Sequence, residues 1–337
     1  MFLIAFVIII VTAVLIKVYV KLTVGICRCS RHLVGKVVIV TGGNTGIGYE
    51  AAKDLAERGA RVILACRTNE KGIAARDLIK SETGNTDVHY QQLDLASLAS
   101  VRTFADGIIK TEKRVDILIN NAGVFEVDNI RTKDGLSLAM QSNHFGHFLL
   151  TSLLLPLLKS STPSRIINVS SKAYEGGKID FDNLNNEKDT AETYSHQLNA
   201  YSKTKLCNVL MTLELNRRLK GTGVTANCLH PGVVATDILL KLQKSFLRFF
   251  MPLLKPFFKT PLEGAQTTIY LAVSPEVEGV SGKYFVDCKE ATILKYAQDK
   301  EMARKLNKLP QTDTHHGLTF KNCLSSMILT SISVPQC

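Results

Sequence analysis

A tyrosine and a lysine stand four residues apart in the segment 201–205 (YSKTK). On a helix, residues at positions i and i+4 share a face, so the hydroxyl of Tyr201 and the ammonium of Lys205 can point to one site. A free tyrosine has a pKa of about 10 and is a poor base at neutral pH. A nearby ammonium favours the phenolate and brings the tyrosine toward a range useful for proton transfer. Ser171 follows an apolar run and could hold a carbonyl oxygen beside this hydroxyl.

A glycine cluster follows an earlier apolar run directly, in the segment 41–48 (TGGNTGIG). Glycines let the backbone turn sharply and bring its N–H groups against a pyrophosphate at the start of the next helix. A glycine-rich turn without a ligand is the alternative, and the apolar run before it and the helical segment 49–58 after it favour the binding loop. The residues predicted to contact a cofactor here are Gly42, Asn44, Thr45, Gly46, Ile47 and Gly48.

The end of the second apolar run distinguishes between the two nicotinamide dinucleotides. NAD sites of this kind usually place an acid about 20 residues past the glycines, where it binds the ribose 2′-hydroxyl. Here that position reads Ala65-Cys66-Arg67, so the acid is missing and a base follows. A guanidinium can pair with a 2′-phosphate in bidentate fashion, whereas an acid would repel it. The sequence therefore predicts NADP(H), with Arg67 as the discriminating residue and Lys71 as a helper; a solvated surface arginine is the alternative.

Two further runs end in residues suited to the same cofactor. Asp94 and Leu95 end the third run, at a height where a carboxylate can accept a hydrogen bond from the adenine amino group. The fourth run ends in the segment 120–123 (NNAG), whose amides can satisfy exposed backbone groups where the chain turns beneath the nicotinamide ribose. The residues predicted to contact the cofactor at this turn are Asn121, Ala122 and Gly123.

These residues need elements to position them, and short apolar runs alternate along the chain with segments long enough for a helix. Runs that are apolar throughout are typical of strands in a parallel sheet covered on both faces. Repeated βα units at this spacing predict an α/β, doubly wound parallel sheet of the Rossmann type, with ligands at the carboxyl ends of the strands. The predicted strands are 36–41, 61–65, 88–95, 116–120, 165–169 and 224–229.

The first residues are the strongest anomaly of composition. Met1 to Ile16 carry no charged side chain, and apolar residues continue past Lys17 to Leu22. About 20 such residues span the hydrocarbon core of a bilayer. Basic residues follow the run, so the positive-inside rule places the bulk of the chain in the cytosol. We predict a membrane anchor at 1–22 rather than a cleaved signal peptide, a basic juxtamembrane linker at 23–35, a single NADP-binding domain at 36–310 and a C-terminal tail at 311–337.

Composition excludes several other classes of protein. The 337 residues are 45% hydrophobic and 21% charged, which is enough apolar content for a sizeable core. The net charge of +11 suits an anionic cofactor or membrane, and no basic block resembles a nucleic-acid motif. Eight dispersed cysteines predict unpaired thiols and no metal, and His144 and His147 are predicted to be packed helix residues. Cys27 and Cys29 follow the anchor, where free thiols and S-acylation are both open.

Between residues 36 and 291 these motifs resemble, in order, the short-chain dehydrogenase/reductase family, and within it the membrane-bound retinol dehydrogenases. The family's active-site serine falls on Ser171 rather than Ser170, and its asparagine falls on Asn143 in the segment 143–148 (NHFGHF). Its nicotinamide-side loop falls on the segment 231–236 (PGVVAT). The loop adds four residues to the predicted cofactor contacts, namely Pro231, Gly232, Val234 and Thr236.

The resemblance implies hydride transfer between a nicotinamide and a carbon–oxygen centre, with no metal. Tyr201 would give or take the proton on the substrate oxygen, and Ser171 would orient that oxygen. Lys205 would lower the pKa of Tyr201 and bind the nicotinamide ribose, so that both residues also contact the cofactor. Asn143 would support a water-linked proton path to Lys205. The resemblance also implies the endoplasmic reticulum membrane.

The segment 237–263 concerns the substrate. Between Asp237 and Glu263 no acidic residue occurs, and leucines and phenylalanines are interleaved with basic residues. In the family this segment covers the substrate; the pattern also fits a membrane interface, and ordinary core packing is the alternative. Each arrangement favours a lipophilic alcohol or aldehyde, first of all retinol and retinal. A hydroxysteroid or fatty-aldehyde reductase and a catalytically silent lipid-surface scaffold are the alternatives, and the oligomeric state stays open.

Overall fold

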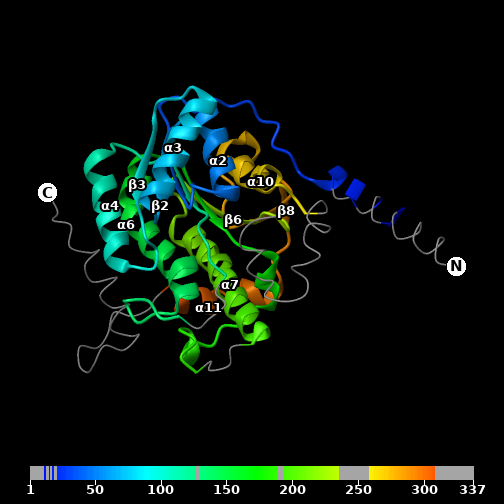
Figure 1. Ribbon diagram of the computed structural model, residues 1–337. Coiled ribbons are helices and arrows are strands. Elements are labelled where there is room, and N and C mark those ends of the chain that lie inside the picture. Colours follow the sequence, from blue (N-terminus) through cyan, green and yellow to red (C-terminus); the bar gives the residue numbers. More distant parts are fainter. Residues whose placement is uncertain are drawn as a thin grey trace.

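A single twisted sheet with helices on both faces forms the body of the protein (Figure 1). The computed structural model describes residues 11–12, 15, 17–18, 21–125, 130–188, 193–234 and 258–307. Within these ranges the sheet has eight strands in the order β3-β2-β1-β4-β5-β6-β7-β8. All neighbouring strands are parallel except β7 and β8. The prediction of a doubly wound parallel sheet in one domain is confirmed.

The six predicted runs form the first six strands. These are β1 (Val37–Thr41), β2 (Arg61–Cys66), β3 (Val88–Gln92), β4 (Ile117–Asn120), β5 (Ser164–Val169) and β6 (Val224–His230). The prediction that the third strand reaches Leu95 is wrong, because the chain turns after Gln92. The Asp94 N–H donates to the Ser100 hydroxyl at 3.0 Å, and the Asp94 carboxylate accepts from the Ala96 N–H at 3.0 Å. These bonds take the place of the strand ladder.

The last two strands were not predicted from the sequence. β7 (Tyr284–Val286) and β8 (Lys289–Ala291) form a hairpin. Its turn holds Asp287 and Cys288 at φ values of 51° and 59°, where turns of this kind usually carry Asn-Gly or Asp-Gly. Strands of three residues are too short to show a periodicity, and the turn lacks the usual glycine. The sequence therefore contains neither signal.

Two layers of helices cover the sheet. The helices α2 (Gly46–Glu57), α3 (Asn69–Thr83) and α10 (Pro261–Val273) pack on one face. The other face is covered by α4 (Leu98–Thr111), α6 (Gly146–Ser160) and α7 (Tyr194–Arg218), with α11 (Lys300–Leu306) against α7. The short helices are α5 (Leu138–Met140), η1 (Gln141–Phe145), η2 (Lys172–Gly176), η3 (Phe181–Asn183), η5 (Pro275–Val277) and η6 (Lys295–Gln298).

The burial of the strands explains their composition. In β1, Val38 and Val40 pack toward α2 and α10, whereas Val37 and Ile39 pack toward the other layer. Both faces of the strand are therefore covered, and each position needs an apolar side chain. The strand order reverses between β1 and β4, so the loops that follow them diverge and leave the usual ligand site of this architecture at their carboxyl ends.

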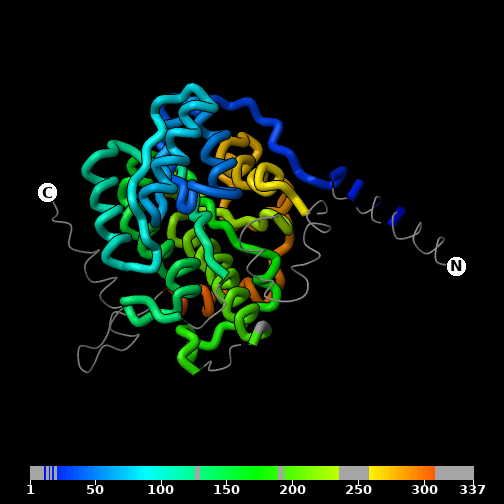
Figure 2. The backbone as a smooth tube through the Cα atoms, viewed as in Figure 1, coloured from blue at the N-terminus to red at the C-terminus, as the bar shows by residue number. Residues whose placement is uncertain are grey.

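The N-terminal segment lies beside α10 on its way to β1 (Figure 2). In the part of the chain that the structure describes, no helix combines the length and the apolar character that crossing a bilayer requires. Most of the predicted anchor 1–22 lies outside the described residues. The same is true of Thr236, most of the segment 237–263 and the predicted tail 311–337.

Candidate functional site

Three of the predicted catalytic residues meet where β5 ends. The side chain of Ser171 is hydrogen-bonded to the Tyr201 hydroxyl. The helix α7 places Lys205 one turn further along, with its Nζ 5.4 Å from the centroid of the Tyr201 ring. The same Nζ donates to the backbone carbonyl of Val169 at 3.1 Å. A substrate oxygen beside the Tyr201 hydroxyl would therefore have a second hydroxyl and an ammonium nearby.

The two adjacent serines after β5 have different partners. Ser171 begins η2, and its Oγ accepts a hydrogen bond from the Ala173 N–H at 3.2 Å. Ser170 is buried, and its Oγ donates to the backbone carbonyl of Lys205 at 2.8 Å. Ser170 therefore ties β5 to α7, and Ser171 is the serine whose side chain contacts Tyr201.

Burial shifts the two titrating groups of the site in opposite directions. It raises the pKa of Tyr201 to about 12, although the hydrogen bond from Ser171 acts the other way. It lowers the pKa of Lys205 to about 8. The sequence led us to expect that Lys205 would lower the pKa of Tyr201, but here burial dominates, and the ammonium donates to the Val169 carbonyl. At neutral pH Tyr201 is a neutral hydroxyl that can donate a proton.

Asn143 lies on the π-helical turn η1, directly before α6. Its Oδ1 accepts from the Val124 N–H at 2.7 Å, and its Nδ2 donates to the Val124 carbonyl at 2.9 Å. The same Nδ2 donates to the Thr204 hydroxyl at 3.1 Å, and that hydroxyl donates to the Tyr201 carbonyl at 2.7 Å. Asn143 thus connects the loop after β4 to the helix that carries Tyr201. Single π-helical turns of this kind are frequent at functional sites.

Gly123 keeps a space open between Asn143 and Lys205. A Cβ built on Gly123 would lie 3.5 Å from Asn143 Oδ1 and 3.5 Å from Lys205 Nζ. The two polar groups therefore border a common space that is about one methyl group wide. A water-linked path between them, as expected from the sequence, needs such a space.

The glycine loop has the properties of an anion-binding helix start. Gly42 adopts a φ of 64°, and a Cβ on Gly48 would lie 2.4 Å from both Asn121 Nδ2 and the Gly42 carbonyl oxygen. α2 then begins at Gly46; the side chain of Thr45 does not cap it, and its first turn contains no acidic residue. The free N–H groups and the positive end of the helix dipole can therefore receive a negatively charged group.

Thr41 supports this loop, although the sequence did not indicate it. Its hydroxyl oxygen accepts hydrogen bonds from the backbone N–H groups of Asn121 at 2.9 Å and Ala122 at 3.0 Å. The Asn121 side chain returns a bond to the Thr41 carbonyl at 2.9 Å. Thr41 and Asn121 thus hold together the loops after β1 and β4. The only sequence signal is a threonine between an apolar run and a glycine, which is too common to identify it.

His147 links the same loops to the π-helical turn. Its Nε2 lies 2.9 Å from the Thr41 hydroxyl, and its Nδ1 lies 3.1 Å from the Asn143 backbone carbonyl. A carbonyl can only accept, so Nδ1 carries the proton and Nε2 accepts from Thr41. Burial lowers the pKa of His147 to about 3 and that of His144 to about 4, so both rings are neutral. The two histidines are packed helix residues, as predicted, but His147 also has a positioning contact.

The remaining predicted cofactor residues lie along the carboxyl edge of the sheet. Arg67 and Lys71 are exposed after β2, Asp94 is half-buried after β3, and Leu95 beside it is buried. Cys66, which the sequence did not indicate, is buried, and its sulfur accepts hydrogen bonds from the backbone of Gly43 and Asn44.

The loop after β6 approaches the start of α2 across α10. Pro231 directly follows β6, and Gly232 adopts a φ of 92°. A Cβ on Gly264 of α10 would meet Val234 Cγ2 at 2.6 Å and Ile47 Cγ1 at 3.2 Å. Val234 and Ile47 are therefore neighbours, as two residues of one cofactor site should be. Thr236 is not among the described residues.

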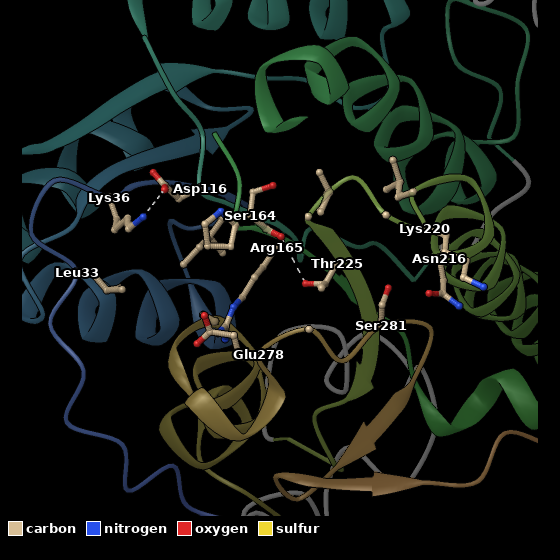
Figure 3. Close-up of a pocket in the computed structure, with 18 of the residues that line it drawn as sticks. Leu33, Lys36, Asp116, Ser164, Arg165, Asn216, Lys220, Thr225, Glu278 and Ser281 are labelled. Carbon is tan, nitrogen blue, oxygen red and sulfur yellow. Dashed lines mark hydrogen bonds and ion pairs between the residues drawn. The ribbon is translucent and has the colours of Figure 1, made fainter. Parts of the chain in front are cut away.

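A cavity of about 410 Å³ lies at the opposite, amino edge of the sheet (Figure 3). Lys36, Asp116 and Ser164 line it at the starts of β1, β4 and β5, with Arg165 reaching across. The Arg165 guanidinium donates to the Leu271 and Ser274 carbonyls, at 2.9 and 3.0 Å. It thereby satisfies the carboxyl end of α10, which is a structural role. No residue of the predicted site lines this cavity.

Among the described residues, no group of three or more histidine, cysteine, aspartate or glutamate side chains could hold a metal ion. The six cysteines in these ranges are free thiols.

Known proteins share both the sequence and the fold of this chain. The family model for short chain dehydrogenases matches residues 36–181. Human retinol dehydrogenase 14 is 47% identical over 81% of this chain and 84% of its own length. Human retinol dehydrogenase 13 is 49% identical over 87% of this chain and 88% of its own length.

Solved structures of other proteins have a similar fold. An uncharacterized protein from Mycobacterium paratuberculosis superposes with a TM-score of 0.67 at 32% identity, over 82% of this chain and 94% of its own. A short chain dehydrogenase from Shigella flexneri 2a, complexed with NADP, superposes with a TM-score of 0.62 at 25% identity, over 77% of this chain and 100% of its own. Identity of nearly one half over most of both chains decides the relationship: this chain belongs to the short-chain dehydrogenase family, in the branch of the retinol dehydrogenases.

Proposed function

We propose that this protein is an NADP(H)-dependent oxidoreductase that interconverts a lipophilic alcohol and its aldehyde, with retinol and retinal as the substrate pair. The observation that carries the proposal is the Tyr201 hydroxyl, which is hydrogen-bonded by Ser171 one helical turn from Lys205. This group lies at the sheet edge where the glycine loop and the uncapped start of α2 also lie. The names of the similar retinol dehydrogenases support the choice of substrate.

The residues present fit a bound NADP(H). The first turn of α2 offers N–H groups without a competing carboxylate, which suits a pyrophosphate. Arg67 would bind the 2′-phosphate, Asp94 the adenine amino group and Lys205 the nicotinamide ribose. The residues 121–123 and 231–234 would border the nicotinamide end. When bound, the dinucleotide supplies or accepts the hydride.

The proton is moved by residues of the chain. In the reductive direction Tyr201 donates its proton to the substrate oxygen, which Ser171 holds in place, and the product is the alcohol. The Lys205 ammonium then returns a proton to the tyrosine, and Lys205 regains its proton by way of the space beside Gly123 and Asn143. In oxidation Tyr201 takes the proton from the alcohol instead. The raised pKa of Tyr201 keeps it protonated at neutral pH, which suits reduction.

The protein is proposed to act at a membrane, most suitably that of the endoplasmic reticulum. The uncharged run from Met1 to Ile16 and the basic residues after it support an N-terminal anchor with the catalytic domain in the cytosol. A lipophilic substrate that is dissolved in the bilayer would then be close to the enzyme.

The test is NADPH oxidation by the detergent-solubilised full chain with all-trans-retinal, with NADH in parallel. Tyr201→Phe should lower kcat by roughly 10²- to 10⁴-fold, which is the usual contribution of a positioned general acid. Tyr270→Phe is the matched control because Tyr270 lies on α10, away from the site, and the change removes a hydroxyl that bonds Glu276 in η5. It should leave kcat within about twofold of wild type, since surface substitutions have small effects.

Each outcome of these assays tests a different part of the proposal. A preference for NADPH that is lost in Arg67→Gln supports the assignment of Arg67. Activity on a steroid ketone or a fatty aldehyde, but not on retinal, would retain the mechanism and reject the retinoid. Bound NADPH without turnover on any of these substrates would show a silent scaffold.

A further inference from the structure

The segment between the predicted anchor and β1 is fastened to the body of the protein along its length. We call residues 23–33 the strap. Contacts fix it and the lysine that precedes it to α10 and to the residues just beyond α10. In chain order, Lys21 pairs with Glu263, the Cys27 N–H donates to Gln266 at 3.0 Å, the Cys29 thiol donates to the Val273 carbonyl at 3.6 Å, and Arg31 pairs with Glu278 at 3.3 Å.

Alternate residues of the strap face the protein. Cys27 and Cys29 are half-buried and pack against the apolar cluster beneath α2 and α10, whereas Ile26, Arg28 and Ser30 are exposed. A Cβ on Gly25 would lie 1.9 Å from the backbone oxygen of Asp287, so only glycine fits there. The inward position of both thiols favours packed free cysteines over S-acylation. This segment is therefore a docked part of the domain, although its composition suggests a linker.

The direction of the strap determines which edge of the sheet lies near the anchor. α10 begins beside Val234, after the carboxyl end of β6, and ends beside Arg165, at the amino end of β5. The strap follows α10 in the same sense, because Lys21 pairs near the start of α10 and Arg31 pairs beyond its end. The anchor is therefore joined to the carboxyl edge of the sheet, where the catalytic residues lie. Figures 1 and 2 show the N-terminal end leaving the body beside α10 and β8.

The strap is also bonded to the loop at the nicotinamide end of the site. The Gly25 N–H donates to the Asp287 carboxylate at 3.3 Å, and the same carboxylate pairs with Lys259. Lys259 is buried; its Nζ donates to the Pro231 carbonyl at 3.4 Å, and its backbone N–H donates to the Val233 carbonyl at 3.0 Å. Two side chains, those of Asp287 and Lys259, thus connect the strap to residues 231–233.

Large apolar side chains are exposed around the point where the anchor meets the domain. Leu22 is 80% exposed, Ile26 59%, Val233 55% and Leu262 51%. The contacts above bring the neighbours of these residues together: Lys21 beside Leu22 pairs with Glu263 beside Leu262, Cys27 after Ile26 bonds Gln266, and Lys259 bonds Val233. Grouped apolar side chains of this kind mark an interaction site. Their continuity with an uncharged run long enough to insert in lipid identifies the partner as the bilayer.

We propose that the strap is a rigid spacer that holds the carboxyl edge of the sheet against the bilayer, with Leu22, Ile26, Val233 and Leu262 in contact with lipid. The proposal rests on the proposed membrane anchor, but it adds an orientation that an anchor on a flexible tether would not impose. The mouth of the active site then faces the membrane surface, and a lipophilic substrate can enter from lipid.

The chain contains no tryptophan, so one introduced tryptophan reports a single position. Leu262→Trp and, separately, Val233→Trp are reconstituted as full chains in phosphatidylcholine–phosphatidylserine vesicles with or without brominated acyl chains. Side chains at the headgroup–acyl boundary should lose about half of their emission to the brominated lipid. Ile109→Trp on α4, which is 49% exposed on the other face of the sheet, is the control and should keep its emission.

A second pair of variants tests whether the strap sets the orientation. Gly25→Ala, combined with Leu262→Trp, should displace the strap and reduce quenching toward the Ile109→Trp level. Ser30→Ala changes an exposed strap residue and should leave quenching unchanged. Quenching that does not respond to Gly25→Ala would overturn the spacer role.

The remaining outcomes separate this inference from the proposed function. Protein that floats with the vesicles while Leu262→Trp and Val233→Trp stay unquenched would refute the orientation and leave the anchor standing. Protein that does not float would refute the anchor and this inference together. Quenching needs no turnover, so a quenched but inactive protein would refute only the proposed activity.

Discussion

Tyr201 and Lys205 share one face of α7, yet burial changes their acidity in opposite ways. The pKa of about 12 makes the Tyr201 phenolate a stronger base than the Lys205 amine, whose pKa is about 8. Once Tyr201 has given its proton to a substrate, transfer from the Lys205 ammonium back to the phenolate is therefore favourable. The pair is better understood as a donor with a proton reserve than as a tyrosine kept ionised by its neighbour.

Gly123 provides a test of that reserve. In Gly123→Ala the added methyl would make ordinary contacts, 3.5 Å from both Asn143 Oδ1 and Lys205 Nζ, so the fold should be retained. The methyl would occupy the space between them, and kcat for retinal reduction should fall about 10-fold or more, because a relay that depends on correctly placed groups is sensitive to small displacements. Steady-state kinetics and a thermal melt of the same sample measure the two effects.

Gly48→Ala is the contrasting variant. Its methyl would lie 2.4 Å from Asn121 Nδ2 and from the Gly42 carbonyl oxygen, so the cofactor loop itself must shift. It should raise KM for NADPH and lower the melting temperature, whereas Gly123→Ala should keep the melting temperature and lower kcat more than it changes KM. Equal turnover of Gly123→Ala and wild type would show that no proton passes through this space.

Among the elements, the π-helical turn η1 and the helix α6 depend on a bond made by a side chain. The His147 ring donates to the carbonyl of Asn143, four residues earlier, and accepts from Thr41 at the end of β1. Thr41 in turn holds the backbone of Asn121 and Ala122. One imidazole therefore joins the turn that carries Asn143 to the loops after β1 and β4. We regard His147 as a positioning residue because it acts through Asn143 and Thr41.

Substitution of His147 should separate this role from simple packing. His147→Phe keeps much of the volume but leaves the Asn143 carbonyl without the imidazole donor, which costs about 1–3 kcal/mol of stability for a buried group. We expect kcat to fall more than KM changes, with partial recovery in His147→Gln, whose amide can donate and accept. Ser152→Ala removes a hydroxyl that bonds the Phe148 carbonyl on the same helix, and it is the control. If His147→Gln and His147→Phe are equally impaired, the hydrogen bonds are not what matters.

Sequence reasoning succeeded for elements whose signal is local and failed where a contact is distant. The six long strands, the glycine loop and the Tyr201–Lys205 pair were predicted because each has its own pattern in a few consecutive residues. The hairpin β7–β8 has no such pattern. The role of Thr41 depends on a histidine 106 positions away, and that of Gly25 on Asp287, 262 positions away. The docking of residues 23–33 could not be predicted without knowing where α10 lies.

In the whole molecule, the amino and carboxyl edges of the sheet have different roles. The amino edge holds the cavity lined by Lys36, Asp116 and Arg165; Asp116 also pairs with Arg114, and Arg165 satisfies the end of α10. The carboxyl edge holds the catalytic residues, the glycine loop and the exposed apolar residues around Leu262. Ion pairs occur at both edges, since Lys21–Glu263 and Lys259–Asp287 lie at the carboxyl edge, but that edge also keeps groups available for ligands. The strap spans both edges and relates the catalytic edge to the membrane.

The stability of the whole domain should depend on pH through its buried histidines. His144 and His147 are buried and neutral, with pKa values lowered by burial to about 4 and about 3. In the unfolded chain both titrate near 6.5, so the unfolded state binds more protons below that pH. The stabilisation is fully present above about pH 6.5 and is lost as the pH falls. Between pH 6.5 and 5, each histidine should remove about 1 to 2 kcal/mol from the free energy of unfolding.

His230 acts in the same direction, because burial lowers its pKa to about 4, and the other groups contribute little in this window. Asp116 and Glu214 have pKa values lowered by arginine partners although burial opposes it, and carboxyl groups of this kind act nearer pH 4 and below. Glu50, whose pKa burial raises, acts in the opposite direction. Urea unfolding of the full chain in detergent, at pH values of about 6.5, 5.75 and 5, gives the slope of the free energy of unfolding against pH. In His147→Gln the slope should fall by about a third, because one of the three titrating rings, those of His144, His147 and His230, is gone. A slope that is unchanged in this variant would mean that His147 is already protonated in the folded protein, and it would remove the tautomer on which the link between Thr41 and Asn143 depends.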